Sequence, residues 1–249
     1  MTLLRHAAAA LCLAAGLLAL PAVAPAGEAL SDTQMQAVDQ RIHDYLMAHP
    51  EVIIESLQAY DQQRSQAEAA QQKQAIADLR EELLHAPGDP VGGNPQAGFT
   101  VVEFFDYHCP YCKAVAADFL DAVKKDGNVR VVFKDFPILG DSSVFAAKAA
   151  LAADKQGRYV AFYRAVMALK GDLSEEAVFR AAKAQGLDVE RLKQDMAAPE
   201  IAQRISRNYD LARALGIHGT PAFIIGDELV PGALPMSELM AKVEQHRKG

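Results

Sequence analysis

A Cys-x-x-Cys motif directly after a strongly apolar run places narrow limits on how this chain can fold. Val101 to Phe105 contains a single acid among apolar residues, which predicts a strand buried on both faces. The motif Cys109-Pro110-Tyr111-Cys112 follows after three intervening residues. Because Pro110 suits the first position of a helix, Cys109 is predicted at the N-cap of that helix. The chain is therefore expected to carry two thiols at a strand-to-helix turn.

The two cysteines are predicted to differ in reactivity. Unpaired backbone N–H groups and the positive end of the helix dipole favour the thiolate form of Cys109. Cys112 lies about one helical turn deeper on the same side. It is close enough to form a disulfide with Cys109 and too enclosed to attack an outside partner easily. We therefore predict that Cys109 is the nucleophile.

Residues 1–26 have the pattern of a cleaved secretory signal peptide. A basic start precedes an apolar run over residues 7–20, and Ala-Pro-Ala at 24–26 is a small-residue cleavage site. A transmembrane helix is the competing interpretation, but the run is short and no charged stop follows it. Cys12 would leave with this segment, so the mature chain would keep only the Cys-x-x-Cys pair. In an exported protein such a pair is typical of redox chemistry.

The charge and the remaining motifs argue against several classes of protein. The formal net charge is −7, and the predicted leader holds one Arg and no acid, so the mature chain is more acidic still. This charge argues against nucleic acid or an anionic membrane as a partner. A structural zinc site is not predicted, because no second Cys pair or His pair has suitable spacing. No metal site is therefore assigned from the sequence.

Residues 27–86 are predicted to form a helical arm. A first helix begins at Ser31 or Asp32 and breaks at His49-Pro50, and a second continues to about residue 85. Neither shows a core of its own, so the arm must pack on the following domain or on copies of itself. We favour oligomerisation. The Pro- and Gly-rich residues 87–98 are predicted to be a linker. The apolar face of the first helix consists of Met35, Val38, Ile42, Tyr45 and Leu46.

Residues 99–249 are predicted to form an α/β domain. Two apolar runs on either side of the helix after the cysteines indicate a βαβ unit with parallel strands. A section of about five helices, over residues 138–215, has no strand signal and is predicted to be a helical insertion. Thr220-Pro221 then opens a β-hairpin with a Gly-Asp turn, and a last amphipathic helix follows.

This order of elements resembles the DsbA-like branch of the thioredoxin superfamily. The resemblance rests on Phe99 to Lys113 and on Gly219 to Gly232, and it extends from Phe99 to the C-terminus. It implies a thioredoxin fold with a helical insertion. The arm, with the sequence His49-Pro-Glu-Val-Ile53, is similar to the ScsC-like (suppressor of copper sensitivity) subgroup. Some members of that subgroup are trimeric disulfide isomerases, which implies that the arm joins three copies of the chain.

The resemblance also implies roles for individual residues. The redox-active disulfide between Cys109 and Cys112 would be the only redox group, with no separate cofactor, and Cys112 would resolve the mixed disulfide. Thr220 and a cis Pro221 would present backbone to a substrate strand beside the thiols. Glu103 matches the buried acid that accepts the Cys112 proton. The alternative is that Glu103 occupies an outward-facing position on its strand. Lys134 is a candidate charge partner of Glu103, or simply a surface charge at a strand end.

Residues around the thiols are expected to tune the redox pair. His108 would add positive character near Cys109, and Pro110 and Tyr111 lie between the two sulfurs in sequence. His108 and Tyr111 could equally be ordinary rim residues. His218 either lines the same groove or lies on a loop surface, and the surface interpretation is favoured.

The sequence thus predicts a periplasmic thiol-disulfide oxidoreductase, with disulfide isomerase as the preferred activity. Its partners would be unfolded or misoxidised exported proteins and a membrane redox protein that recycles the cysteines. A dithiol oxidase of the DsbA type is the first alternative. The others are a Cu(I)-binding copper-tolerance protein that uses the same thiols, and a chaperone or adaptor without catalysis.

Overall fold

The computed structural model describes residues 30–248, and these residues form two compact units. The first unit ends at Tyr60 and the second begins at Asp61. The predicted signal peptide, residues 1–26, lies outside the described residues. Within residues 30–248 no helix has the length and the apolar character needed to cross a membrane. Each unit is described below by itself.

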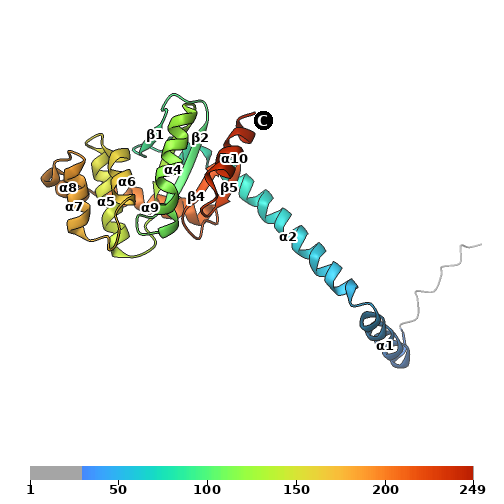
Figure 1. Cartoon of the computed structure of the whole chain (residues 1–249). Helices are drawn as coiled ribbons and strands as arrows, with labels where there is room; N and C mark the ends of the chain where they lie inside the picture. Colours follow the sequence, from blue (N-terminus) through green and yellow to red (C-terminus); the bar gives the residue numbers. More distant parts are fainter. Residues whose placement is uncertain (1–29, 249) are drawn as a thin grey trace, which may run out of the picture. The chain divides into compact units, whose positions relative to one another are not determined.

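The second unit is built on a five-stranded mixed sheet with the order β1-β3-β2-β4-β5 (Figure 1). β2 and β3 are parallel, and the other neighbouring strands are antiparallel. α4 (Pro110–Asp126) connects β2 to β3, so the predicted βαβ unit is present. The strands are β1 (Val91–Gly93), β2 (Thr100–Phe105), β3 (Arg130–Asp135), β4 (Ala222–Ile225) and β5 (Glu228–Pro231). This sheet with its helical insertion confirms the predicted fold class.

The two faces of the sheet bury different side chains because successive strand residues point to opposite faces. On one face, Val101 and Phe105 of β2 join a large core with α4 and the helical insertion. On the other face, Val102 and Phe104 pack with the ends of α2 and α9 and with α3. β2 is therefore buried on both sides, as its unbroken apolar run predicted.

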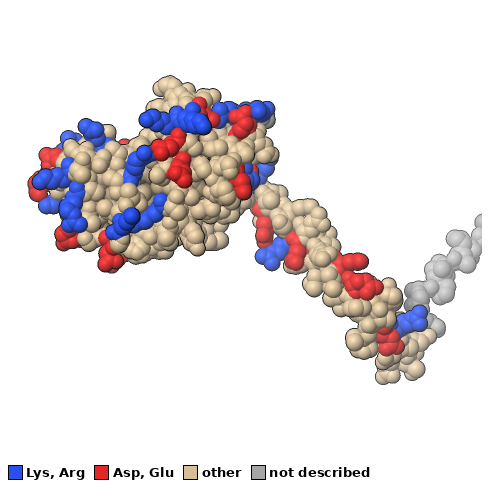
Figure 2. All heavy atoms as spheres, viewed as in Figure 1, with Lys and Arg blue, Asp and Glu red and all other residues tan. Residues whose placement is uncertain are grey.

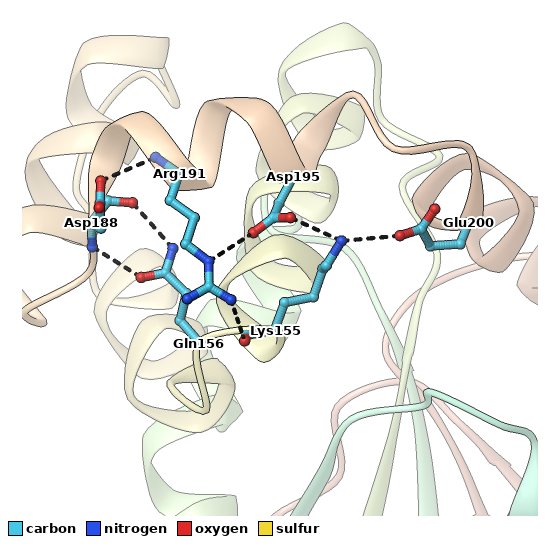
Figure 3. Close-up of polar contacts among 6 residues, drawn as sticks. All are labelled: Lys155, Gln156, Asp188, Arg191, Asp195 and Glu200. Carbon is cyan, nitrogen blue, oxygen red and sulfur yellow. Dashed lines mark hydrogen bonds and ion pairs between the residues drawn. The ribbon is translucent and has the colours of Figure 1, made fainter.

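The helical insertion lies between β3 and β4 and contains five helices (Figure 1). Its helices are α5 (Asp141–Asp154), α6 (Tyr159–Met167), α7 (Glu175–Ala184), α8 (Val189–Met196) and α9 (Pro199–Ala214). A polar network connects the end of α5 to α8 and α9 (Figure 3). In it, Lys155 contacts Asp195 at 2.8 Å and Glu200 at 3.0 Å, and Arg191 contacts Asp195 at 3.5 Å. The last helix of the chain is α10 (Met236–Lys248).

The prediction of a linker at 87–98 was wrong in part, because this segment contains the strand β1. β1 pairs antiparallel with β3, with Val91 opposite Val132, and so forms one edge of the sheet. The strand has only three residues, and two are Gly, so the composition hid it. Gly93 has φ of +66°, and a Cβ there would collide with the backbone carbonyl of Val129. Glycine is needed at this position for close approach to the neighbouring chain segment.

The boundary of the predicted arm also differs from the structure. α2 (Glu51–Asp78) runs from the first unit into the second, and α3 (Arg80–His85) lies wholly in the second. Ile76 and Leu83 are 3% and 1% exposed and belong to the core on the β2 face opposite the insertion. Residues 61–86 thus belong to the second unit. The alternation of polar and apolar residues along α2 did not reveal where its packing on the sheet begins.

The first unit contains α1 (Asp32–Ala48) and the start of α2. Ser31 caps α1 through a reciprocal capping box with Gln34, which fixes the start of the helix. α1 has no buried residue. The large exposed apolar side chains of this unit are Leu30, Met35, Val38, Ile42, Tyr45, Met47, Ile53, Ile54, Leu57 and Tyr60. In the rest of the described chain only Tyr111 and Leu139 are large, apolar and exposed.

Candidate active site

Cys109 lies at the junction between the sheet and α4, as predicted. It is the N-cap residue of α4, and Pro110 occupies the first helical turn. The backbone N–H of Cys109 donates to the Asp106 carbonyl at 3.1 Å, and the N–H of Lys113 donates to the Cys109 carbonyl at 3.0 Å. These bonds place the sulfur over the free N–H groups at the start of the helix.

The Cys109 thiol is the acidic one of the pair. The pKa of Cys109 is lowered from 9.0 to about 5, chiefly because the Cys112 thiol donates a hydrogen bond to it. Burial opposes this lowering of the pKa, whereas Thr220 and the backbone N–H groups of Cys112 and Tyr111 support it. No disulfide joins Cys109 to Cys112 in this structure, and Cys109 is 4% exposed. At neutral pH its sulfur is therefore a thiolate.

Cys112 has the opposite character. It is fully buried, and burial raises its pKa far above that of an ordinary thiol. The neighbouring Cys109 and the charge of Glu103 raise the pKa of Cys112 further. The Cys112 thiol consequently keeps its proton at neutral pH.

Thr220 and Pro221 lie directly beside Cys109. The Cys109 Sγ is 3.2 Å from the Thr220 carbonyl oxygen, to which the protonated thiol donates. The Thr220–Pro221 peptide bond is cis, as the family resemblance implied. A hollow of about 270 Å³ adjoins this loop, with apolar walls that include Ile217, Pro221 and Leu229. The loop thus brings backbone to Cys109 and has an apolar hollow on its own surface.

Glu103 is buried on the face of the sheet that carries the thiols. The Tyr163 hydroxyl lies 3.1 Å from both carboxyl oxygens of Glu103 and donates to them. Burial raises the pKa of Glu103 to about 8, Tyr163 opposes the rise, and the negative charge of Asp135 adds to it. The interpretation as an outward-facing surface acid was wrong. A carboxyl with this pKa, close enough to influence Cys112, is suited to exchange a proton with it.

Lys134 is not the partner of Glu103, and that prediction was wrong. In the β2–β3 ladder Glu103 stands opposite Phe133, so Lys134, one residue on, points to the other face of the sheet. Its ammonium is paired with Asp89 and donates to the Glu82 carbonyl at 2.8 Å. Both partners of the ion pair are buried. Lys134 therefore holds the chain segment before β1 on the sheet, and the surface-charge interpretation was also wrong.

The predicted tuning residues form the rim of the site. His108, Pro110 and Tyr111 are all exposed, and Tyr111 is 66% exposed. The His108 ring Nδ1 is 3.2 Å from the Ser142 hydroxyl at the start of α5. His218 is exposed on its loop, as the surface interpretation predicted. All four of these residues are exposed, whereas Cys112 is fully buried.

Two further buried acids, Asp106 and Asp135, were not predicted. Asp106 accepts hydrogen bonds from the backbone N–H of His108 at 2.6 Å, the N–H of Leu139 at 2.9 Å and the Ser143 hydroxyl at 2.7 Å. It therefore ties the active-site turn to the start of the insertion. Asp135, the last residue of β3, is 1% exposed. The signal for both was an acid at the end of a predicted buried strand.

Comparison with known proteins is consistent with this geometry. The model of the DSBA-like thioredoxin domain family matches residues 100–244. The chain belongs to this family. A second model, the copper resistance protein ScsC N-terminal domain, matches residues 34–67. The predicted resemblance to DsbA-like and ScsC-like proteins is therefore confirmed.

Solved structures of similar proteins cover most of the chain. A thioredoxin-like oxidoreductase from Silicibacter pomeroyi DSS-3 is 48% identical with a TM-score of 0.66, covering 68% of this chain and 98% of that one. ScsC from Proteus mirabilis in a transitional conformation is 28% identical with a TM-score of 0.65, covering 87% and 98%.

A curated relative, the Na(+)/H(+) antiporter NhaA of Herminiimonas arsenicoxydans, is 30% identical over 172 residues. That match covers 67% of this chain, which spans only 28% of the antiporter.

Proposed function

We propose that this protein is a thiol-disulfide oxidoreductase of exported proteins, with Cys109 as the attacking thiol and Cys112 as the resolving thiol. The opposite pKa shifts of the two sulfurs within one strand-to-helix turn carry this proposal. A thiolate at neutral pH attacks disulfides, and a buried thiol one turn away is positioned to displace the attached substrate. The DsbA-like family match supports the same chemistry.

The experiment combines two serine substitutions with a model protein disulfide. Cys109→Ser is expected to abolish reduction of insulin by dithiothreitol above the uncatalysed rate. Cys112→Ser is expected to keep the attack step and to accumulate a mixed disulfide with the substrate, visible by mass spectrometry. If Cys109→Ser accumulated the mixed disulfide as readily as Cys112→Ser, the assignment of the two thiols would be wrong.

Within this activity we infer disulfide isomerisation by an oligomer, with three copies joined through the first unit. The support is the exposed apolar face of α1. In a single chain this face would stay in contact with water, which is unfavourable. Copies of the same chain bury such a face readily, because each presents an identical amphipathic helix. Several active sites on one assembly also raise the effective concentration of thiolates around a misfolded substrate.

A charge on the apolar face of α1 tests the assembly. Val38→Asp combined with Ile42→Asp is expected to yield monomers in size exclusion with light scattering, and Gln36→Asp on another face of α1 serves as the matched control. The monomer should lose isomerisation of a scrambled multi-disulfide protein and keep insulin reduction. A trimer that persists in the double variant would exclude this face as the interface, and unchanged isomerisation by the monomer would exclude the role of assembly.

The periplasm is the proposed location, with a membrane redox protein as the partner that recycles the cysteines. The predicted leader at 1–26 and the absence of other cysteines in the mature chain support export to an oxidising compartment. Trapping of thiols in intact cells gives the direction of the reaction. A mostly reduced pair is expected for an isomerase, and a mostly oxidised pair would mean that the protein is a dithiol oxidase.

Copper binding has less support as a second activity. It is suggested by the match of residues 34–67 to the copper resistance protein ScsC N-terminal domain, and two thiolates can bind Cu(I). Among residues 30–248 no group of three or more His, Cys, Asp or Glu side chains could hold a metal ion. Copper content after anaerobic purification, with a competing chelator, tests this alternative. If a weak chelator removed the copper, the copper-binding alternative would be excluded.

A further inference from the structure

A second buried acid lies on the same face of the sheet as Glu103. In the parallel ladder Glu103 is opposite Phe133, and Phe105 is opposite Asp135. Because strand residues two apart point to the same face, Glu103 and Asp135 both point toward α6 and the large core. Glu103 is 0% exposed and Asp135 is 1% exposed. Two carboxyl groups therefore share one buried layer on this face of the sheet.

Two tyrosines of α6 hold these carboxyls. The Tyr163 hydroxyl donates to Glu103, and the Tyr159 hydroxyl donates to Asp135 Oδ2 at 2.8 Å. The two tyrosine rings are stacked with their centroids 6.4 Å apart. Among the described residues, Asp135 Oδ1 and the buried Tyr107 hydroxyl have no hydrogen-bond partner. Polar atoms of this layer can therefore form hydrogen bonds in addition to those between α6 and the sheet.

The charges that face Asp135 come from several elements. Arg204 of α9 favours the ionised carboxylate, and Asp89 disfavours it. Asn208 of α9 donates to the Asp135 backbone carbonyl at 3.0 Å, not to its side chain. Lys134 points to the opposite face of the sheet and pairs with Asp89. Where the sequence predicted a cation next to Glu103, the structure thus has a second acid.

We propose that Asp135, positioned by Tyr159, controls when Glu103 takes or gives the Cys112 proton. This inference rests on the proposed thiol-disulfide chemistry and adds a positioning residue to it. Asp135 itself does not touch the reacting sulfurs. It acts on Glu103 through its charge.

The order of ionisation in the pair follows from the neighbours of each acid. Burial raises the pKa of Asp135 to about 8, while Tyr159 and Arg204 oppose this rise. Glu103 has no cation among the causes of its shift, and the charge of Asp135 raises the pKa of Glu103. Asp135 therefore ionises first, and its negative charge then makes Glu103 retain a proton to higher pH.

Glu103 exchanges a proton with Cys112 in both directions of the reaction. In resolution, the Glu103 carboxylate takes the Cys112 proton, and the Cys112 sulfur attacks Cys109. The Cys109–Cys112 bond forms as the bond to substrate breaks, and the substrate sulfur leaves with the electron pair as a reduced thiolate. In the reverse direction, a substrate thiolate attacks Cys109 of the enzyme disulfide, and protonated Glu103 supplies the proton to the departing Cys112 sulfur. A Glu103 that keeps its proton thus slows resolution and assists the reverse attack.

The test follows the reduced protein with 5,5′-dithiobis(2-nitrobenzoate) in a stopped-flow instrument over pH 5–10. The first release of the coloured thiolate reports attack by Cys109, and the second reports resolution by Cys112. In Asp135→Asn the pH midpoint of the second phase is expected to move to lower pH by roughly half a unit or more, because a like charge is removed. The first phase is expected to stay unchanged.

Two further variants separate charge from packing. Tyr159→Phe removes the hydrogen bond that stabilises ionised Asp135, so the midpoint is expected to move in the same direction. Asp118→Asn, an exposed acid on α4, removes the same charge and should leave the midpoint where it is. A midpoint that stays in place in Asp135→Asn, or in Tyr159→Phe if the first variant fails to fold, would overturn the role of Asp135. Loss of the second phase in the wild-type protein would instead refute the proposed function itself.

Discussion

Replacing Cys112 with Ala should raise the pKa of Cys109 strongly. The hydrogen bond from the Cys112 thiol is the largest cause of the lowered pKa, which stands at about 5 against an ordinary value of 9.0. A hydrogen bond to a charged group contributes about 1.5–3 kcal/mol, and one pKa unit corresponds to about 1.4 kcal/mol. The loss of this bond should therefore raise the pKa of Cys109 by roughly one to two units.

The assay is titration of the thiolate absorbance at 240 nm in the reduced protein, with the rate of alkylation by iodoacetamide as a second measure. At pH 6 the wild-type protein should be about 90% thiolate, and Cys112→Ala should be about half thiolate or less. Cys112→Ser is the matched control, because a hydroxyl still donates to Cys109 and should preserve part of the effect.

Two results would refute this reasoning. An unchanged pKa of about 5 in Cys112→Ala would mean that the backbone N–H groups of α4 and Thr220 alone hold the thiolate. A wild-type pKa close to 9 would mean that Cys109 is an ordinary thiol, and the proposed catalysis would lose its physical basis.

Three other predictions concern the buried charges. Lys134→Met should destabilise the protein by about 3 kcal/mol in urea unfolding, because it leaves the Asp89 charge buried without a partner, and adding Asp89→Leu should recover much of this loss. Tyr163→Phe should raise the pKa of Glu103 above about 8, seen as a shift of the resolving step to higher pH, since the lost hydrogen bond favours the carboxylate. Because the folded pKa of Cys109 is depressed, its contribution to stability is complete above pH 9 and is lost as pH falls through about 5. The stability difference between the reduced wild-type protein and Cys109→Ser should therefore grow from pH 5 to pH 9, and a constant difference would contradict the shift.

The local part of the fold could be predicted because short-range rules govern it. Pro110 at a helix start after a continuous apolar run is sufficient to place Cys109 at the N-cap, and the helical periods over residues 138–215 indicate the five helices of the insertion. Ser31 likewise marks the start of α1. These features depend on neighbours within one helical turn, and the sequence carries them directly.

The partners of the buried charges depended on tertiary structure. Lys134 meets Asp89, 45 residues earlier in the chain, and Glu103 meets Tyr163, 60 residues later. Whether Lys134 or Asp135 lies on the face of Glu103 depends on the register of β2 against β3, and a shift of one residue would reverse the answer. The sequence by itself determined which residues form the redox turn and its helix. Only the packing of strands and of α6 decided which acid and which tyrosines surround the buried thiol, since burial makes pairing obligatory without specifying the pair.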